Sequence, residues 1–300
     1  MAKKERTCLV LGGGGARGLS HLGVLQVLER EAMPVHSIIG TSVGAIVGAA
    51  YSLDPDSLGI TRRALAYLKS AAFRNDAFKK VLLKSEGVGT NFFKNLLSGI
   101  RKSYIFSNLL RKPSIFPAGH LEAMIADLLP DKEFADTKIP FAVPALDIRT
   151  GREIIITQGS LRKAVLASCS LPGFFPPVEH EGMLLADAGV IGPVPVNAAG
   201  HFGPTAIIAV DITSMIEACA PITRGLDAIL RVEAIAGKRL NDIELARADV
   251  VIRPQVGRRY WSDFSDLDGI VEEGLQAAES KVPELRALFQ RKKFSFWRLA

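Results

Sequence analysis

Cysteine is scarce in this chain, and long uninterrupted hydrophobic runs are missing from its start. Among 300 residues there are three cysteines, Cys8, Cys169 and Cys219, at wide and irregular spacing. Their odd number argues against a disulfide framework, and their spacing argues against a zinc site. Glycines end the first apolar stretch after Leu11, too early for a signal peptide. These absences favour a cytoplasmic protein in a reducing compartment.

Aromatic residues are also few, at 7 %, and no Pro/Ser-rich linker or internal repeat divides the chain. Hydrophobic residues make up 48 % of the sequence, which is enough to bury one large core at this length. We therefore expect a single domain over residues 1–300. No cluster of histidine, cysteine and aspartate has metal-ligand spacing, so we expect neither a metal nor another cofactor.

Positive charge is concentrated in two segments of a chain whose net charge is +6. Between Arg62 and Lys112, twelve Lys or Arg residues stand against Asp76 and Glu86, which makes that segment about +10. A second basic cluster lies at the C-terminal end of the sequence, over residues 291–298. These patterns predict a basic helical insertion or lid at about 60–130 and a basic amphipathic tail at about 285–300.

The basic insertion interleaves aromatic and aliphatic residues with lysine and arginine over residues 92–106. An amphipathic helix on an anionic bilayer has this composition, although solvated helix faces would also explain the charge. Nucleic acid is not an expected partner, because no nucleic-acid-binding motif accompanies the basic residues. We expect peripheral contact with the inner membrane surface, and leave open whether the insertion is a lid, a membrane contact or the surface of a homo-oligomer.

One uncharged stretch, Val35–Leu53, resembles a membrane span in composition. It has no Asp, Glu, Lys or Arg, and Gly40, Gly44 and Gly48 repeat the small-residue spacing of packed transmembrane helices. A strand over Val35–Ile39, a sharp turn and a buried helix explain more of its residues. We therefore expect that second arrangement.

The order of expected elements indicates an α/β fold. A strand over Thr7–Leu11, a glycine loop, a helix over Leu19–Glu31 and a second strand alternate as in a parallel sheet covered on both faces. Strands over Phe141–Ile148 and Glu153–Thr157 flank a hairpin signal, which makes the sheet mixed. The prediction is a three-layer α/β/α fold with a central, mainly parallel sheet. The other expected elements are helices near 120–129, 160–167 and 226–248 and strands at 183–186, 205–210 and 250–253.

Two glycine-containing segments carry the strongest functional signal. The segment Gly40–Gly44 fits G-x-S-x-G, the turn that presents a serine between a strand and a helix. The earlier run Gly12–Gly18 follows the first strand, and the backbone amides of such a run can converge on an oxyanion. Glycine loops also mark dinucleotide sites, so either segment alone is weak evidence. Together they predict an acyl hydrolase with Ser42 as the nucleophile.

Ser42 needs a base, because a serine hydroxyl is a poor nucleophile at neutral pH. Histidine is the usual base, and the late His201 is the one candidate for the α/β-hydrolase order of serine, acid and histidine. However, His201 lies in what resembles an ordinary loop. Asp187 ends the apolar run Met183–Ala186 and is followed by small residues that leave room for a substrate. We therefore favour Asp187 as the base.

On these residues the sequence resembles the patatin-like phospholipase family, whose serine works with an aspartate and without histidine. The resemblance rests on four segments that occur in the family's order and with similar spacing over most of the chain. They are Gly13–Gly18, Gly40–Gly44, Ala167–Pro177 and Asp187–Gly189. Any one alone would be weak, but the ordered set is a specific match.

The resemblance implies roles for individual residues. Ser42 would attack the ester, and Asp187 would accept its proton and later activate water for deacylation. The N–H groups of Gly13, Gly14 and Gly15 would form the oxyanion hole. Arg17 would hold the loop or add positive potential, unless it makes only a structural ion pair, and His21 would pack near the loop. Further supporting residues are Gly18, Gly40, Gly44 and Gly189.

Two departures from the family pattern stand near the base. Ala188 occupies a position where the family usually has glycine, so its methyl group is expected to narrow the site or change the backbone angles. Pro193 falls where the family tends to carry asparagine, so a side-chain hydrogen bond that orients the loop is expected to be lost.

The implied activity is that of a serine lipid acyl hydrolase of the phospholipase A or lysophospholipase type. A soluble carboxylesterase or acyl-thioesterase of the same fold is an alternative, and Ala188 and Pro193 keep open a catalytically weak regulatory homologue. A nucleotide-binding module is disfavoured, because no acidic residue ends the second strand and no Gly-Lys-Ser/Thr follows the glycine loop.

Overall fold

The computed structural model describes residues 6–71, 73, 111–216, 222–223 and 225–297. Most of the expected basic insertion, including residues 92–106, lies outside the described residues, as does Cys219. Of the basic residues counted between Arg62 and Lys112, the structure therefore describes only those at the two ends of the segment.

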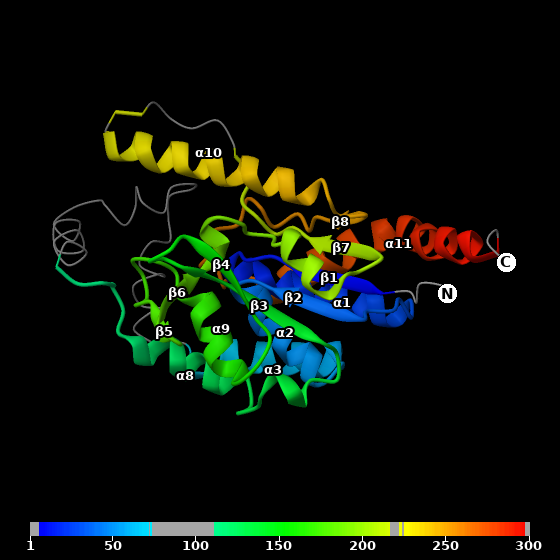
Figure 1. Cartoon of the computed structure of the whole chain (residues 1–300), viewed down its shortest axis with the longest axis horizontal. Coiled ribbons are helices and arrows are strands. Elements are labelled where there is room, and N and C mark those ends of the chain that lie inside the picture. The colour runs from blue at the N-terminus through cyan, green and yellow to red at the C-terminus, as the bar shows by residue number, and fades with distance from the viewer. Residues whose placement is uncertain (1–5, 72, 74–110, 217–221, 224, 298–300) are drawn as a thin grey trace.

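An eight-stranded mixed sheet forms the centre of the described fold (Figure 1). Its strand order is β5-β6-β3-β2-β1-β7-β8, and β4 pairs with β3. Strands β1, β2, β3, β7 and β8 are joined in parallel, whereas β4, β5 and β6 pair antiparallel at one side. The predicted mainly parallel mixed sheet is thus confirmed. The strands are β1 (Thr7–Leu11), β2 (Ser37–Gly40), β3 (Phe141–Asp147), β4 (Arg152–Ile156), β5 (Val178–His180), β6 (Met183–Asp187), β7 (Ala206–Val210) and β8 (Val250–Ile252).

The helices follow the predicted order, with additions. Helix α3 overlaps the start of the helical insertion expected at about 60–130. The prediction did not include β5 or the long helix α11, whose last part contains residues 285–297. The α-helices are α1 (Ser20–Arg30), α2 (Val43–Leu53), α3 (Ser57–Lys69), α8 (Ala118–Leu128), α9 (Leu161–Cys169), α10 (Gly225–Leu245) and α11 (Leu267–Trp297). The short 3-10 helices are η1 (Gly15–Leu19), η2 (Phe134–Asp136), η3 (Ala188–Val190) and η4 (Asn197–Phe202).

The two faces of the sheet are covered unequally. Alternate strand residues point to opposite faces, so Leu9 and Ile38 pack into a large core with α1, α2, α8, α9 and α11. Val10 and Ile39 pack on the other face into a smaller core with η4 and the last turn of α10. The fold therefore has three layers, and one helical layer is much thinner than the other.

The uncharged stretch Val35–Leu53, whose composition resembles a membrane span, forms a strand, a turn and a helix, as expected. Strand β2 ends at Gly40, and α2 begins at Val43. Among the described helices, none is both long enough and apolar enough to cross a bilayer.

Sheet register brings the functional segments together at one edge. Leu11 at the end of β1 pairs with Gly40 on one side and with Val210 on the other, so the glycine loop and the serine turn start side by side. In β3, Ala142 pairs with Ile39 and Ala145 pairs with Asp187. Three residues beyond Ile39, the chain reaches Ser42, which is therefore close to the level of Asp187.

Candidate active site

Ser42 occupies a strained turn between β2 and α2. Its φ of 55° and ψ of −124° are unusual for a residue with a side chain and store on the order of 1–3 kcal/mol of strain. Gly44 allows this turn, because a Cβ atom there would collide with the Leu11 carbonyl oxygen. The G-x-S-x-G interpretation is consistent with this geometry, and the side chain of Ser42 lines a cavity at the sheet edge.

The glycine loop is held from behind by two buried side chains. His21 is fully buried, and Nε2 lies 2.8 Å from the Gly12 carbonyl oxygen. Burial lowers the pKa of His21 to about 4, so the neutral ring donates Nε2–H to this carbonyl at pH 7. Arg17 donates from Nε to the Gly14 carbonyl oxygen at 3.0 Å and from Nη1 to Ser214 Oγ at 2.6 Å. Both residues shape the loop.

Arg17 remains charged while it is buried. Burial lowers the pKa of Arg17 to about 10, and the opposite charge of Asp211 counters the shift. The bond from Arg17 to the Gly14 carbonyl is consistent with a role for Arg17 in holding the loop, which stays a prediction. The groups that accept hydrogen bonds from Arg17 are the Gly14 carbonyl and the Ser214 hydroxyl, both neutral, and the charge of Asp211 acts on it in addition.

The backbone N–H groups of the glycine loop differ in whether they have a hydrogen-bond partner. In a trans peptide the N–H points opposite to the preceding carbonyl, so the bond from His21 to Gly12 turns the Gly13 N–H the other way. The Gly13 N–H donates to the Pro193 carbonyl oxygen at 2.8 Å. Within the described part of the chain, the N–H groups of Gly14 and Gly15 have no hydrogen-bond partner. Of the three amides expected to face an oxyanion, that of Gly13 is therefore already engaged, and those of Gly14 and Gly15 remain available among the described residues.

Gly15 is required by the shape of the loop. Its φ of 61° lies in the left-handed region, and a Cβ atom there would collide with the Trp261 carbonyl oxygen. The same carbonyl accepts a hydrogen bond from the Ala16 N–H at 2.6 Å. The segment that contains Trp261 therefore packs directly against the glycine loop, although it is distant in sequence.

Asp187 ends β6 and is nearly fully buried, with 4 % of its surface exposed. Its Oδ1 accepts a hydrogen bond from the Gly189 N–H at 2.7 Å. Burial raises the pKa of Asp187 to about 6, although hydrogen bonds from the Ser42 side chain and the Gly189 N–H oppose the shift. The group is therefore ionised at pH 7 and close enough to its pKa to exchange protons.

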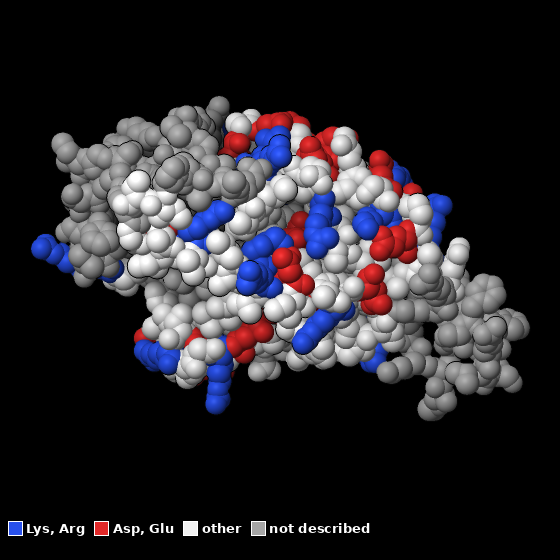
Figure 2. All heavy atoms as spheres, turned by 90° about the horizontal axis from the view of Figure 1, so that it is seen from above, with Lys and Arg blue, Asp and Glu red and all other residues white. Residues whose placement is uncertain are grey.

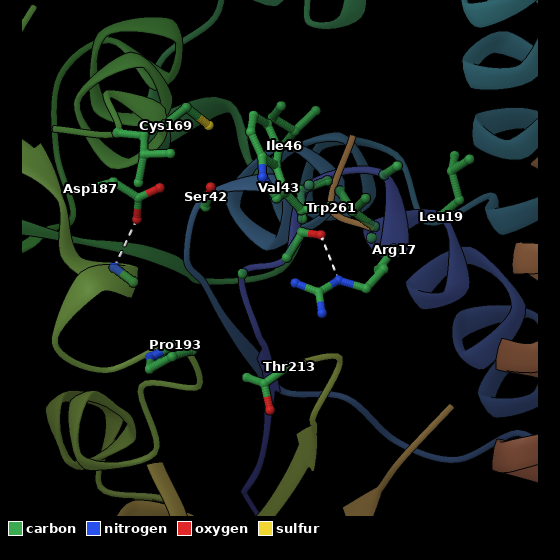
Figure 3. Close-up of a pocket in the computed structure, with 18 of the residues that line it drawn as sticks. Arg17, Leu19, Ser42, Val43, Ile46, Cys169, Asp187, Pro193, Thr213 and Trp261 are labelled. Atoms are coloured by element: carbon green, nitrogen blue, oxygen red, sulfur yellow. Dashed lines mark hydrogen bonds between the residues drawn. The ribbon is translucent and has the colours of Figure 1, made fainter. Parts of the chain in front are cut away.

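Ser42 and Asp187 face each other across the cavity (Figure 3). The sulfur of Cys169 lies beside them, and burial together with the charge of Asp187 raises the pKa of this thiol. Cys169 is therefore a neutral thiol at pH 7. The arrangement supplies a hydroxyl, a carboxylate that can take its proton, and two unpartnered amides nearby.

The cavity has a volume of about 570 Å³ and is continuous with the glycine loop. Its polar end includes Arg17, Thr213, Ser214, Lys238 and Asn241 as well as the Ser42 and Asp187 side chains. Its other walls come largely from three helices and are mostly apolar, although the charged residues Arg63, Asp127 and Glu233 also line the cavity. The apolar residues include Ile46, Val47 and Ala50 of α2, Ile60, Ala64 and Leu68 of α3, and Leu121, Met124 and Leu128 of α8.

The remaining expected residues lie around this arrangement. Gly40 and Gly44 flank Ser42, Gly18 packs against Val43, and Gly189 bonds the carboxylate of Asp187. By contrast, His201 is in η4 and does not line the cavity. Among the described residues, no group of three or more His, Cys, Asp or Glu is arranged to hold a metal ion.

The two departures from the family pattern have different outcomes. Ala188 is fully buried and is not among the described residues with positive φ, so its methyl group packs without backbone strain. At Pro193 the side-chain amide is absent, but the adjacent Val194 N–H donates to Oδ1 of Asn241 at 3.1 Å. A hydrogen bond to this loop is therefore present, and it comes from α10.

Three residues at the site were not singled out from the sequence. Ser168 accepts a hydrogen bond from the Ser42 N–H, the Trp261 carbonyl closes the glycine loop, and Asn241 holds the loop at Pro193. Ser168 lies in the segment Ala167–Pro177 that supported the resemblance, so a signal for it existed. Nothing local in the sequence marks the other two.

Known proteins are similar to this chain in sequence and in fold. A family model described as patatin-like phospholipase matches residues 9–199. The chain is 32 % identical over 213 residues to patatin-like phospholipase domain-containing protein 6 of Homo sapiens, covering 70 % of this chain and 13 % of that one. It is 28 % identical over 211 residues to lysophospholipase NTE1 of Mycosarcoma maydis, covering 69 % of this chain and 10 % of that protein.

The chain spans only about one tenth to one seventh of the length of such relatives. Among solved structures, VipD from Legionella pneumophila is similar with a TM-score of 0.50 and 15 % identity, and the match covers 95 % of this chain and 67 % of VipD. At that identity the likeness concerns the fold.

Proposed function

This chain belongs to the patatin-like phospholipase family, and on that premise we propose that it is a serine hydrolase that cleaves acyl ester bonds of phospholipids or lysophospholipids. The family as a whole supports a lipid ester hydrolase. The observation that carries the finer assignment is the meeting of Ser42 and Asp187 in one cavity beside two unpartnered loop amides.

The proposed reaction has two steps. The Ser42 Oγ attacks the ester carbonyl while Asp187 takes the hydroxyl proton, and the leaving alcohol then receives that proton as the ester bond breaks. Water attacks the resulting acyl-serine, Asp187 takes a proton from the water, and the proton returns to Ser42 as the fatty acid leaves. The pKa of Asp187 near 6 suits both directions of proton transfer at neutral pH.

The N–H groups of Gly14 and Gly15 are the proposed donors to the oxyanion of each tetrahedral intermediate. Arg17 holds the Gly14 carbonyl, which turns the Gly15 N–H away from Arg17. Donors fixed in advance lower the barrier because they need no reorganisation, and loss of one such donor typically costs about 100- to 1000-fold in rate.

The apolar walls favour an acyl chain as the group bound beyond the ester. Helix α2 starts next to Ser42 and lines the cavity through Ile46, Val47 and Ala50, so the apolar lining continues about 12 Å along its axis. We assign the acyl chain to this side. The polar residues Thr213, Ser214 and Lys238 are then available to the alcohol part of the substrate.

Peripheral membrane contact is part of the proposal, and its support is the basic composition between Arg62 and Lys112. On the face seen from above, the described Lys and Arg residues are interspersed with Asp and Glu (Figure 2). Co-sedimentation with anionic vesicles should occur at low salt and weaken at high salt. Binding that is equal at both salt concentrations would contradict an electrostatic attachment.

The direct test of the function is a panel of phospholipids, lysophospholipids, soluble esters and acyl thioesters, with products measured by mass spectrometry. Wild type and Ser42→Ala are compared side by side. Release of fatty acid from lipids by wild type alone supports the proposal. Turnover confined to soluble esters or thioesters would replace the lipid substrate, and equal turnover by both proteins would refute the mechanism.

A further inference from the structure

Asn241 is connected to the glycine loop by a short series of backbone contacts. Its Oδ1 accepts a hydrogen bond from the Val194 N–H at 3.1 Å. The preceding residue, Pro193, uses its carbonyl to accept the Gly13 N–H at 2.8 Å. A Cβ atom built on Gly13 would lie 3.2 Å from Cβ of Ser42, so the loop touches the nucleophile there. The side chain of Asn241 is thus two hydrogen bonds from the loop beside Ser42.

The burial of Asn241 suggests more than packing. The residue has no exposed surface, and it lines the same cavity as Ser42 and Asp187. Within the described chain, its Nδ2 has no hydrogen-bond partner. A buried amide with an unmet donor destabilises the fold, so a leucine would be favoured here if filling space were the only requirement.

The position of Asn241 in the chain also matters. It lies on α10, beyond residues 9–199 that the family model matches, and it bonds a loop in which Pro193 has no side-chain amide. A proline residue also lacks an N–H, so the Val194 N–H is the nearest backbone donor that can anchor this loop from outside.

We propose that Asn241 is a positioning residue for the proposed hydrolase, in that it fixes the Pro193–Val194 peptide and through it the Gly13 peptide of the glycine loop. The hydrogen bond from the Gly13 N–H to the Pro193 carbonyl then fixes the conformation of the glycine loop. The Gly14 and Gly15 N–H groups are left free to donate to the oxyanion. Helix α10 completes the active site in this way. The kinetic part of the inference rests on the proposed function, whereas the structural link does not.

The test compares Asn241→Leu and Asn241→Ala, which remove the acceptor, with Asn241→Asp, which retains an acceptor oxygen at the same place. Leu240→Ala is the matched control, because Leu240 is the preceding residue of α10, is 51 % exposed and does not line the cavity. A short soluble ester is the substrate, so membrane contact does not affect the result. Thermal unfolding of each variant identifies any that fail to fold.

The first readout is the division of the effect between kcat and KM. Asn241→Leu and Asn241→Ala should lower kcat at least about tenfold and leave KM within about twofold, because the loss falls on the transition state. Asn241→Asp and Leu240→Ala should stay within about threefold of wild type. Equal losses in Asn241→Asp and Asn241→Leu, or an unchanged kcat in a folded Asn241→Ala, would overturn the proposal.

The second readout is hydrogen exchange of the peptide that contains Gly13, which requires no activity. Its amide should exchange on the order of tenfold faster in Asn241→Ala than in wild type or Leu240→Ala. Unchanged exchange would overturn the link between α10 and the loop. If the Gly13 amide exchanges faster in Asn241→Ala than in wild type but wild type hydrolyses no ester, the link is supported and the proposed function is refuted instead.

Discussion

The backbone N–H of Ser42 donates a hydrogen bond to the Oγ of Ser168 at 3.0 Å. Ser168 is in the last turn of α9, and two residues later the Ser170 carbonyl accepts the Asp187 N–H at 3.0 Å. The end of α9 therefore bonds the backbone of both proposed catalytic residues. These two contacts tie the backbones of Ser42 and Asp187, which come from separate strands, to the end of one helix.

Removal of the Ser168 hydroxyl should reduce activity more than stability. In Ser168→Ala the Ser42 N–H loses its acceptor, so the strained turn relaxes and kcat should fall roughly tenfold, as expected when a supporting hydrogen bond is lost. Steady-state kinetics and thermal unfolding measure the two effects.

Ser160→Ala provides the contrast on the same helix. Ser160 caps the start of α9 by accepting from the Lys163 N–H, so its replacement should cost about 1 kcal/mol of unfolding free energy and leave kcat nearly unchanged. If both variants lose stability and activity in the same proportion, Ser168 has no special relation to Ser42.

Activity should rise with pH through the titration of Asp187. Burial raises the pKa of this carboxyl to about 6, and only the ionised form can accept the Ser42 proton. A plot of kcat/KM against pH should therefore increase with a midpoint near 6 and level off above it. A profile that is flat from pH 5 to pH 8, or one that falls, would exclude Asp187 as the base.

Replacement of the base should stabilise the fold while it abolishes activity. The folded state binds the Asp187 proton more tightly than the unfolded chain, whose pKa is near 3.8, so wild type loses stability as pH rises from about 4 to about 6. Asp187→Asn lacks this penalty. Its free energy of unfolding should exceed that of wild type by up to about 3 kcal/mol above pH 6.

Denaturant titrations at pH 4 and pH 8 measure this difference. The gain should be present at pH 8 and nearly absent at pH 4, because protonated Asp187 is neutral like asparagine. A gain that is equal at both pH values would show that burial of the charge is not its cause.

A larger side chain at position 50 should shorten the preferred acyl chain. Ala50 lines the cavity two turns into α2, on the apolar side assigned to the acyl group. Ala50→Phe should lower kcat/KM for long-chain esters at least about tenfold relative to short-chain esters, since overpacking costs about 1–3 kcal/mol. If esters of all chain lengths lose activity equally, the acyl chain lies elsewhere.

Local sequence patterns were sufficient for the elements that carry Ser42 and Asp187. Apolar runs bounded by glycine identify β1 and β2, and the spacing in Gly40–Gly44 identifies the turn, because these depend on neighbouring residues. The order of motifs along the chain predicts Asp187 rather than His201 as the base, and this assignment stays a prediction. The structure places Asp187 opposite Ser42 and leaves His201 outside the cavity.

The hydrogen bonds that complete the site could not be predicted in this way. The sequence does not indicate that the Gly13 N–H is bonded to Pro193, because that bond depends on where a distant loop packs. The contribution of Asn241 was missed for the same reason, since α10 looks like an ordinary amphipathic helix. Strand β5 has only three residues and gives too short a pattern to recognise.

The most direct test of the central claim is covalent labelling with a fluorophosphonate, followed by intact-protein mass spectrometry. Such a probe reacts with a serine only when a base and an oxyanion site activate it. We predict one adduct on wild type at Ser42, none on Ser42→Ala, and labelling of Asp187→Ala slowed at least about 100-fold. Labelling of Asp187→Ala at the wild-type rate, or an adduct on Ser42→Ala, would contradict the account.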